Sequence, residues 1–414
     1  MFISKKNQLY LFFSLITLTL ILRINVESTQ YCTPDSNYYL EVTRNMQNGL
    51  GPVGPKVFEF DKEKGTLIPL YDSTKFGNPE SYKKDFFAVW PLGYPISILA
   101  ISNLTTLDPL WASKLLNIIL LAVDFYLLFL LFGEFSLLSI FYFGSFTMLE
   151  NVSYTWSENL FITTFLLLFY ALNKLQQKDT VSYKYISLLS IALFGMCFSR
   201  YASAIFYSTP LLFFIYYGRK KEWSKVVNIS IGVTLSLVLL IAYLYYNYIQ
   251  TGYITGMPRI GTQEFTFIEL TQKFFIGQFN QLHIIKQFRF SGKSDFLFYC
   301  STTLLQLILM GIVTYQLVRK PLALTLSFLQ RLLLASGFIY LVFITYMTFT
   351  STIDAFDYRT LLPYSFPIMV VILTYVEQKL FLSNNEKIIT LLKLFFVFSL
   401  LMNLPKKFII ESIF

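Results

Sequence analysis

The chain has 414 residues, of which 55% are hydrophobic, 19% aromatic and only 14% charged. This composition excludes an ordinary soluble protein, whose apolar runs are short and interrupted. The net charge of +9 does not indicate binding to nucleic acid, because the lysines and arginines stand in short clusters between apolar segments. Loops that face an anionic inner leaflet have this pattern. The sequence therefore predicts an all-α polytopic protein that is surrounded by membrane lipids.

Apolar segments near the length that a transmembrane helix needs, about 20 residues, recur along the whole chain. They predict about eleven transmembrane helices, over residues of about 8–24, 110–132, 135–149, 157–172, 185–198, 201–217, 226–249, 296–318, 332–350, 362–376 and 389–404. The segment WPLGYPISILAI is shorter and contains two prolines, which is more typical of an interfacial or re-entrant piece. Without an internal repeat or linker, residues 1–414 are expected to form a single transmembrane domain.

The basic loops predict the orientation of these helices. Lys5 and Lys6 precede the first span, and several basic residues occur in each of the loops NKLQQKDTVSYKY, GRKKEWSK, RKPLALTLSFLQR and EQKLFLSNNEK. Loops rich in lysine and arginine stay on the inner side of a membrane. This register leaves a large first outer loop at about 25–113, with juxtamembrane helices, and a second at about 250–295.

The stretch TPDSNYYLEVTRNMQNG in the first outer loop predicts a helix with an acid in its first turn. Thr33 is expected to cap this helix, Pro34 suits its first position and Gly49 suits its end. The helix dipole favours an ionised Asp35, which suits a base or a metal ligand, and Tyr39 follows one turn later on the same face. The simpler interpretation is that Asp35 only starts the helix.

Further ionisable residues are expected at the same side of the membrane. Glu158 begins a later helix with Ser157 as its predicted cap, while Arg200 in FSRYAS is expected at the outer surface of the bundle because its turn is tight. Arg259 and Arg359 are also expected near outer helix ends. Each arginine taken singly is typical of a headgroup anchor. Together with the acid of the first outer loop they predict a site for a phosphate-bearing substrate.

These motifs resemble those of the GT-C superfamily of membrane glycosyltransferases, in particular the protein O-mannosyltransferase and aminoarabinose transferase group, over nearly the whole chain. No single motif is specific, but six occur in the family's order. They are PDSNYYLEVTRNMQNGLG, WPLGYPISILA, WSENLF, SRYASAIFYSTPLLFF, YNYIQTGYITGMPR and DYRTLLPYSFP. The resemblance implies an inverting transferase that moves a sugar from a polyprenyl-phosphate-linked donor to an acceptor hydroxyl on the outer, periplasmic face.

The resemblance also implies roles for individual residues. Asp35 matches the family's catalytic acid, a general base toward the acceptor hydroxyl. Arg200 and Arg359 match arginines near the lipid phosphate, and Arg259 is placed with them in the third arginine-bearing motif. The acceptor is a glycan, a lipid such as lipid A, or a protein. By analogy with the family, the location is the inner membrane of a bacterium.

The sequence departs from the family at the second acid that many relatives carry, because Ser36 follows Asp35 here. Glu80 or Asp85 are candidates for that acid, and further candidates for the site are Glu158 and Tyr39. The sequence therefore leaves open whether Asp35 binds a divalent cation.

Two other functions fit a chain of this kind. A polysaccharide polymerase or ligase also has many spans and a large outer loop, but its arginines are expected mainly in a late outer loop. A transporter or flippase for lipid-linked sugars is expected to place charged residues near the bilayer midplane on broken helices. The predicted acids and arginines of this chain lie instead at one rim, which favours the glycosyltransferase.

Overall fold

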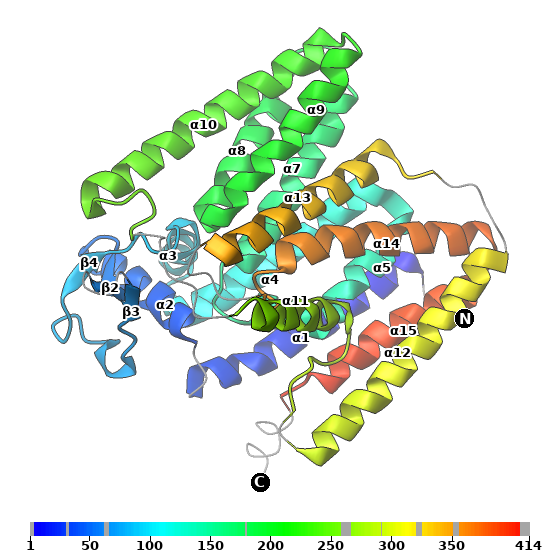
Figure 1. Cartoon of the computed structure of the whole chain (residues 1–414), viewed down its shortest axis with the longest axis horizontal. Coiled ribbons are helices and arrows are strands. Elements are labelled where there is room, and N and C mark those ends of the chain that lie inside the picture. The colour runs from blue at the N-terminus through cyan, green and yellow to red at the C-terminus, as the bar shows by residue number, and fades with distance from the viewer. Residues whose placement is uncertain are drawn as a thin grey trace.

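The computed structural model describes residues 4–29, 33–61, 66–178, 180–257, 266–290, 292–319, 325–350 and 356–405. These residues form fifteen α-helices (Figure 1). In chain order they are α1 (Lys5–Thr29), α2 (Pro34–Gln47), α3 (Gly93–Thr105), α4 (Pro109–Phe132), α5 (Leu137–Phe141), α6 (Phe146–Ser153), α7 (Glu158–Gln176), α8 (Tyr183–Ser199), α9 (Ser208–Arg219), α10 (Trp223–Thr251), α11 (Phe267–Leu282), α12 (Lys293–Arg319), α13 (Phe328–Thr350), α14 (Leu362–Leu382) and α15 (Glu386–Met402).

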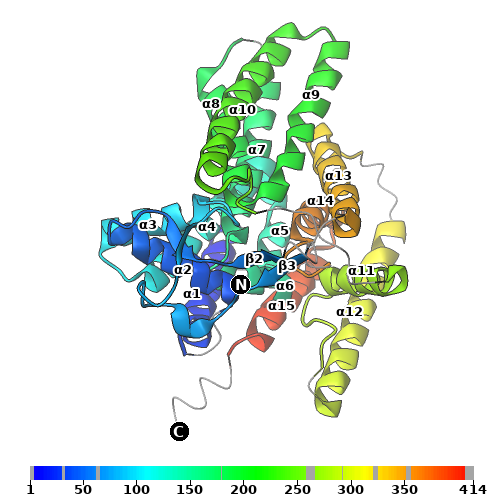
Figure 2. The same ribbon diagram turned by 60° about the vertical axis from the view of Figure 1, so that its left-hand side comes forward.

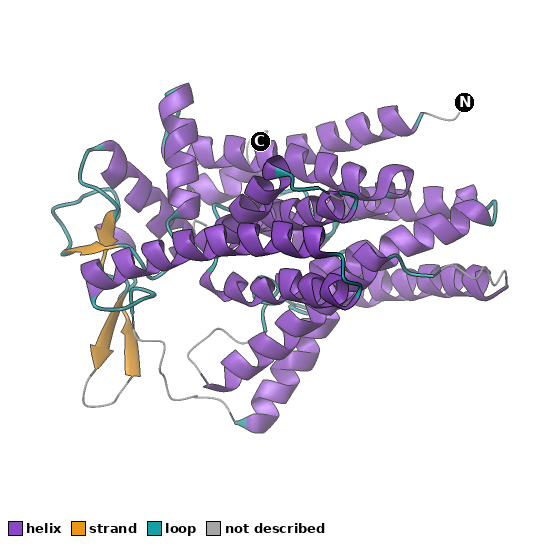
Figure 3. Ribbon diagram, turned by 90° about the horizontal axis from the view of Figure 1, so that it is seen from above, coloured by secondary structure: helices purple, strands orange, loops and turns teal. Residues whose placement is uncertain are grey.

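The predicted first outer loop contains two helices and four short strands. α2 and α3 are the helices, and α3 includes most of the proline-containing segment that was expected to be too short for a span. The strands form two antiparallel pairs, β1 (Val53–Pro55) with β4 (Lys84–Phe86), and β2 (Phe58–Asp61) with β3 (Thr66–Pro69). All four strands gather at one end of the molecule (Figure 3). The sequence did not predict these strands.

Five helical segments are long and apolar enough to cross a membrane, and a bent pair raises the number to six among the described residues. The five segments are Pro109–Phe135, Trp223–Thr251, Lys293–Arg319, Phe328–Thr350 and Leu362–Leu382. The chain is therefore an all-α protein with several membrane-spanning helices. Helices α8 and α15 have 17 residues each and α9 has 12, fewer than the roughly 20 that a straight span needs. The number of about eleven crossings remains a prediction.

The segment expected as a single helix over 135–149 is interrupted. It contains α5, a short 3-10 turn at Tyr142–Gly144 and the start of α6, and α6 meets α7 at a bend of 108°. Ser145 ends the turn because its extended backbone and hydroxyl cap α6, with Met148 N donating to its Oγ at 3.5 Å. Irregular backbone of this kind is tolerated in a membrane protein where other protein segments cover it, and most side chains from residue 137 to 153 are buried.

The core lies where α7 packs between α4 and α8, and where α14 packs against α13 and α5. Its centre is a set of buried aromatic rings, with Phe165 in contact with Phe161, Phe169, Phe206 and Phe366. Helices α7 to α10 stand together at one end of the molecule, and α12 and α15 lie at the other (Figures 1 and 2). The N-terminal ends of α2 and α7 and the turn before α14 meet between these groups.

Candidate functional site

The first turn of α2 holds Asp35 in the way that the sequence predicted. Thr33 is the N-cap, and its Oγ1 accepts a hydrogen bond from Ser36 N at 3.2 Å. Pro34 occupies the first helical position, where its missing N–H costs nothing. At the other end the helix stops at Gln47, and Gly49 has a φ of +74°, a conformation that glycine adopts without strain. The local helix prediction is confirmed.

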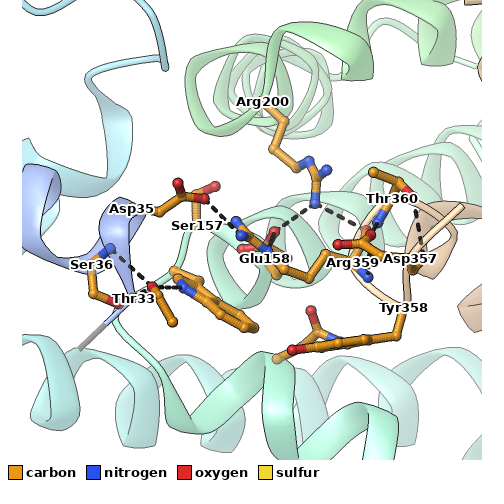
Figure 4. Close-up of polar contacts among 12 residues, drawn as sticks. Thr33, Asp35, Ser36, Ser157, Glu158, Arg200, Asp357, Tyr358, Arg359 and Thr360 are labelled. Atoms are coloured by element: carbon orange, nitrogen blue, oxygen red, sulfur yellow. Dashed lines mark hydrogen bonds and ion pairs between the residues drawn. The ribbon is translucent and has the colours of Figure 1, made fainter. Parts of the chain in front are cut away.

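Four charged residues from four separate segments form one cluster of ion pairs (Figure 4). The Nη1 of Arg359 lies 2.7 Å from the Oδ2 of Asp35, and its Nε lies 2.9 Å from the Oε1 of Glu158. The same Oε1 also accepts from the Nη1 of Arg200 at 2.9 Å. A further hydrogen bond, 3.3 Å long, joins Arg200 Nη1 to the carbonyl of Arg359. Two acids and two arginines thus neutralise one another at a single point.

The turn before α14 fixes the position of Arg359. The Oδ1 of Asp357 accepts hydrogen bonds from the backbone N–H of Arg359 at 3.0 Å and of Thr360 at 2.6 Å. The hydroxyl of Tyr340 on α13 donates to the carbonyl of Thr360 at 3.0 Å. An aspartate that bonds to the backbone a few residues ahead favours such a turn. The letters DYRT contain the signal for this turn.

Trp156 contacts both Arg359 and Thr33, the residue that caps α2. Its ring centroid lies 4.1 Å from the guanidinium carbon of Arg359, and its Nε1–H donates to Thr33 Oγ1 at 2.8 Å. The indole is 3% exposed, so it is a fixed support for the guanidinium through a cation–π contact. One side chain therefore holds both the arginine and the cap of the helix that carries Asp35. Sequence reasoning gave it no role, although Trp156 is the first residue of the quoted WSENLF motif.

The members of the cluster differ in how much of each side chain is exposed to solvent. The side chain of Glu158 is 1% exposed, whereas those of Asp35 and Arg359 are 19% and 21% exposed. The Oε2 of Glu158 has no hydrogen-bond partner in the described part of the chain. Burial works against the charged form of Arg359, but the negative charges of Glu158 and Asp35 outweigh it and hold its pKa well above the ordinary value. The guanidinium is therefore permanently charged.

Two local expectations are wrong. Arg200 does not lie at the outer surface of the bundle: its side chain is only 17% exposed, because it turns inward to pair with Glu158. Ser157 precedes α7 but its side chain caps no N–H group of that helix. Its Oγ instead accepts a hydrogen bond from the hydroxyl of Tyr39 at 3.4 Å. Burial and the charges of Asp35 and Glu158 raise the pKa of Tyr39, so this hydroxyl stays a donor.

The remaining candidates do not join the cluster. Glu80 and Asp85 are exposed, and no described contact links either of them to Asp35. The N–H of Glu80 donates to Asn78 Oδ1 at 3.2 Å, and the carboxylate of Asp85 accepts from Phe86 N at 2.9 Å. Arg259 lies outside the described residues. Of the predicted acids, only Glu158 approaches the arginine that binds Asp35.

The cluster does not have the geometry of a metal centre. Among the described residues no three histidine, cysteine, aspartate or glutamate side chains are grouped as metal ligands. The two nearest acids, Asp35 and Glu158, are held by the guanidinium of Arg359, which donates to both. As arranged, these residues fit a network of acids and arginines rather than an ion bridging two carboxylates. Such a network offers a carboxylate to a proton and guanidinium groups to an anion.

Comparison of the chain with protein-family models, with curated proteins and with solved structures finds no match.

Proposed function

We propose that the protein is a membrane glycosyltransferase that transfers a sugar from a polyprenyl-phosphate-linked donor to an acceptor hydroxyl. One observation carries the proposal: Asp35, at the mouth of α2, is bound by Arg359 at 2.7 Å although the two residues are 324 positions apart. A base for the acceptor and a cation for the departing phosphate then stand side by side. The resemblance to GT-C enzymes assigns these roles to the same two residues.

In the proposed reaction, a carboxylate oxygen of Asp35 takes the proton of the acceptor hydroxyl. The acceptor oxygen attacks the anomeric carbon from the face opposite the phosphate, and a new glycosidic C–O bond forms. The bond between the anomeric carbon and the phosphate oxygen breaks, and its electron pair leaves with the polyprenyl phosphate. The configuration at the anomeric carbon is inverted. General base catalysis of this kind contributes about 10²- to 10⁴-fold to a rate.

The arginines stabilise the negative charge that develops on the leaving phosphate. Arg359 and Arg200 are both fixed by the Oε1 of Glu158, so they need no reorientation when the charge appears, and preorganised charges of this kind are the most effective. Glu158 is 1% exposed and acts as a positioning residue for the two guanidiniums. Asp35 is more exposed, at 19%, which suits a group that contacts the acceptor.

The finer assignments belong to the same proposal. With about eleven crossings and the basic loops inside, Asp35 and Arg359 lie on the outer face, where a donor in the outer leaflet meets water. The membrane is then the inner membrane of a bacterium and the face is periplasmic. The acceptor is a glycan, a lipid or a protein. The outer segment between α1 and α4, with its two helices and four strands, is the part of the chain best placed to recognise it.

The test compares the wild type with Asp35→Asn in proteoliposomes that contain a panel of polyprenyl-phosphate sugars, with transfer or release of sugar followed by mass spectrometry. We expect turnover by the wild type and a loss of at least about a hundredfold in the variant. Glu386→Gln is the matched control, because Glu386 is also an acid in the first turn of a helix, α15, but it is exposed and no described contact links it to the cluster. Equal turnover by Asp35→Asn would refute the role of Asp35. Absence of turnover with every donor in the wild type would refute the transferase.

A further inference from the structure

A groove lies between α1 and α4 at the end of α1 that is farthest from Asp35. Its volume is about 650 Å³, within the range of about 300 to 1,000 Å³ that is typical of ligand sites. The 25 residues of α1 separate the two ends of that helix by about 37 Å at 1.5 Å per residue. The groove is thus distinct from the ion-pair cluster, and nothing in the proposed reaction uses it.

The walls of the groove are mainly apolar, and the groove opens to the outside of the protein. Phe13 of α1 and Phe125 of α4 pack edge to face, with ring centroids 5.8 Å apart, and both line the groove. Tyr10 and Tyr126, which also line it, are 56% and 62% exposed. An opening on the exposed side of two apolar helices, lined by aromatic rings, suits a hydrocarbon chain rather than a water-soluble molecule.

The mouth of the groove carries an excess of positive charge. Lys5 and Lys6 line it together with one acid, Glu134, whose Oε2 lies 3.0 Å from Lys5 Nζ. The pair is exposed, at 44% and 71% of the two side chains, so it is weak and a stronger anion can replace Glu134. Lys5 also interacts electrostatically with one further acid, Glu377, and one further base, Lys393, neither of which lines the groove. Two lysines against one acid leave a net positive mouth.

We propose that this groove binds one phospholipid with an anionic headgroup. The acyl chain lies along the aromatic walls, and the phosphate contacts Lys5 and Lys6, with Glu134 displaced from Lys5. Charge complementarity selects the headgroup, because a zwitterionic lipid offers no net charge to the two lysines. The expected inner position of the N-terminal lysines agrees with this choice, since the inner leaflet carries the anionic lipids. The proposal is independent of the glycosyltransferase reaction.

Native mass spectrometry of the purified full chain tests the site directly. Phosphatidylglycerol and phosphatidylcholine with identical acyl chains are added separately at equal concentration. We expect one retained phosphatidylglycerol per chain, bound roughly tenfold more tightly than phosphatidylcholine, since each lysine near the headgroup contributes to the attraction. The double variant Lys5→Gln/Lys6→Gln should remove this preference. Lys220→Gln/Lys221→Gln is its control, because it deletes the same charge from another basic loop.

A second variant tests the groove without altering its charge. Ala122 lines the groove on α4, and Ala122→Trp should reduce retention of both lipids severalfold by filling the space. Ile241→Trp is the matched control, because Ile241 is 64% exposed on α10 and lies outside the groove. Equal binding of the two lipids, or unchanged binding after loss of both lysines, would overturn the proposal in favour of ordinary boundary lipid. Displacement by an equal concentration of inorganic phosphate would also overturn it, in favour of a soluble-anion site.

Discussion

Two regions of the molecule, the ion-pair cluster and the α1–α4 groove, use the same kind of contact for opposite purposes. In the cluster at α2 and α7, Arg359 Nη1 lies 2.7 Å from Asp35 Oδ2. At the mouth of the α1–α4 groove, Lys5 Nζ lies 3.0 Å from Glu134 Oε2. The first pair is about 20% exposed and belongs to a network with a fully buried glutamate, whereas the second is 44% and 71% exposed. Burial, and not distance, therefore decides the energetic weight of each pair.

The comparison implies that loss of one charge strongly destabilises the buried cluster. The lysines at the mouth of the groove, in contrast, exchange their partners easily. Buried charges depend on their counter-ions, because no water can replace them. Exposed charges are hydrated after a partner leaves, so an incoming anion competes with the original partner on nearly equal terms. A rigid, preorganised pair suits a reaction centre, and a weak pair suits a binding site whose occupant supplies its own charge. The following experiments test this difference.

The largest effect is expected from Glu158→Gln. This change preserves the shape of the side chain but leaves Arg200 and Arg359 without their shared buried acid. We expect the free energy of unfolding to fall by about 3 to 5 kcal/mol, the cost of an uncompensated buried charge. Denaturant titration of the protein in micelles, followed by tryptophan fluorescence, measures the change. A loss below about 1 kcal/mol, as for surface pairs, would show that water already reaches the cluster.

A smaller loss is expected from Arg359→Lys, which preserves the charge. A lysine cannot donate in two fixed directions, so it loses one of the two charge-assisted bonds that join Asp35 and Glu158. The lost bond corresponds to about 1.5 to 3 kcal/mol of unfolding free energy, again measured by denaturant titration. Arg219→Lys is the control, because Arg219 is exposed in the last turn of α9. Equal stability of the two variants would mean that charge alone holds the cluster.

Trp156→Phe should cost less again. The smaller ring still lies beneath Arg359, but the donor to Thr33 Oγ1 is lost, which is expected to cost about 1 kcal/mol. A double-mutant cycle with Thr33→Ala isolates this hydrogen bond from the general effect of a smaller ring. If the indole links the arginine to the helix cap, the two losses will not be additive. Additive losses would show that Trp156 and Thr33 act separately.

The sequence predicted the parts of this protein that depend on neighbouring residues. The cap, proline and glycine that delimit α2 lie within one short stretch, so local rules placed the helix and its acid correctly. The break within residues 135–149 was missed because the apolar pattern continues through it, while the deciding feature is the capping hydroxyl of Ser145. The four strands were missed because each has only three or four residues, too few to show an alternating pattern.

The candidate site shows the same limit more sharply. The expected topology predicted that Asp35, Glu158 and Arg359 lie on one side, but their contacts join residues up to 324 positions apart. Local reasoning placed Arg200 at the surface because its turn is tight. The true position depends on Glu158, 42 residues earlier, which draws the guanidinium inward. Trp156 was missed for the same reason, since its importance arises only when the turn before α14 packs onto it.

The smallest change in stability, and the sharpest contrast with Glu158→Gln, is expected from Glu134→Gln. Both variants remove one carboxylate from one ion-paired glutamate. Since Glu134 is 71% exposed, its loss should alter the free energy of unfolding by less than about 1 kcal/mol. The same change frees Lys5 from the acid that it contacts directly within the described part of the chain, so retention of phosphatidylglycerol should rise by roughly two- to fivefold, as measured by native mass spectrometry. A large loss of stability would contradict the comparison. Unchanged lipid binding would show instead that Glu134 does not compete with the phosphate, and that the positive charge at the mouth of the groove is set by Lys6.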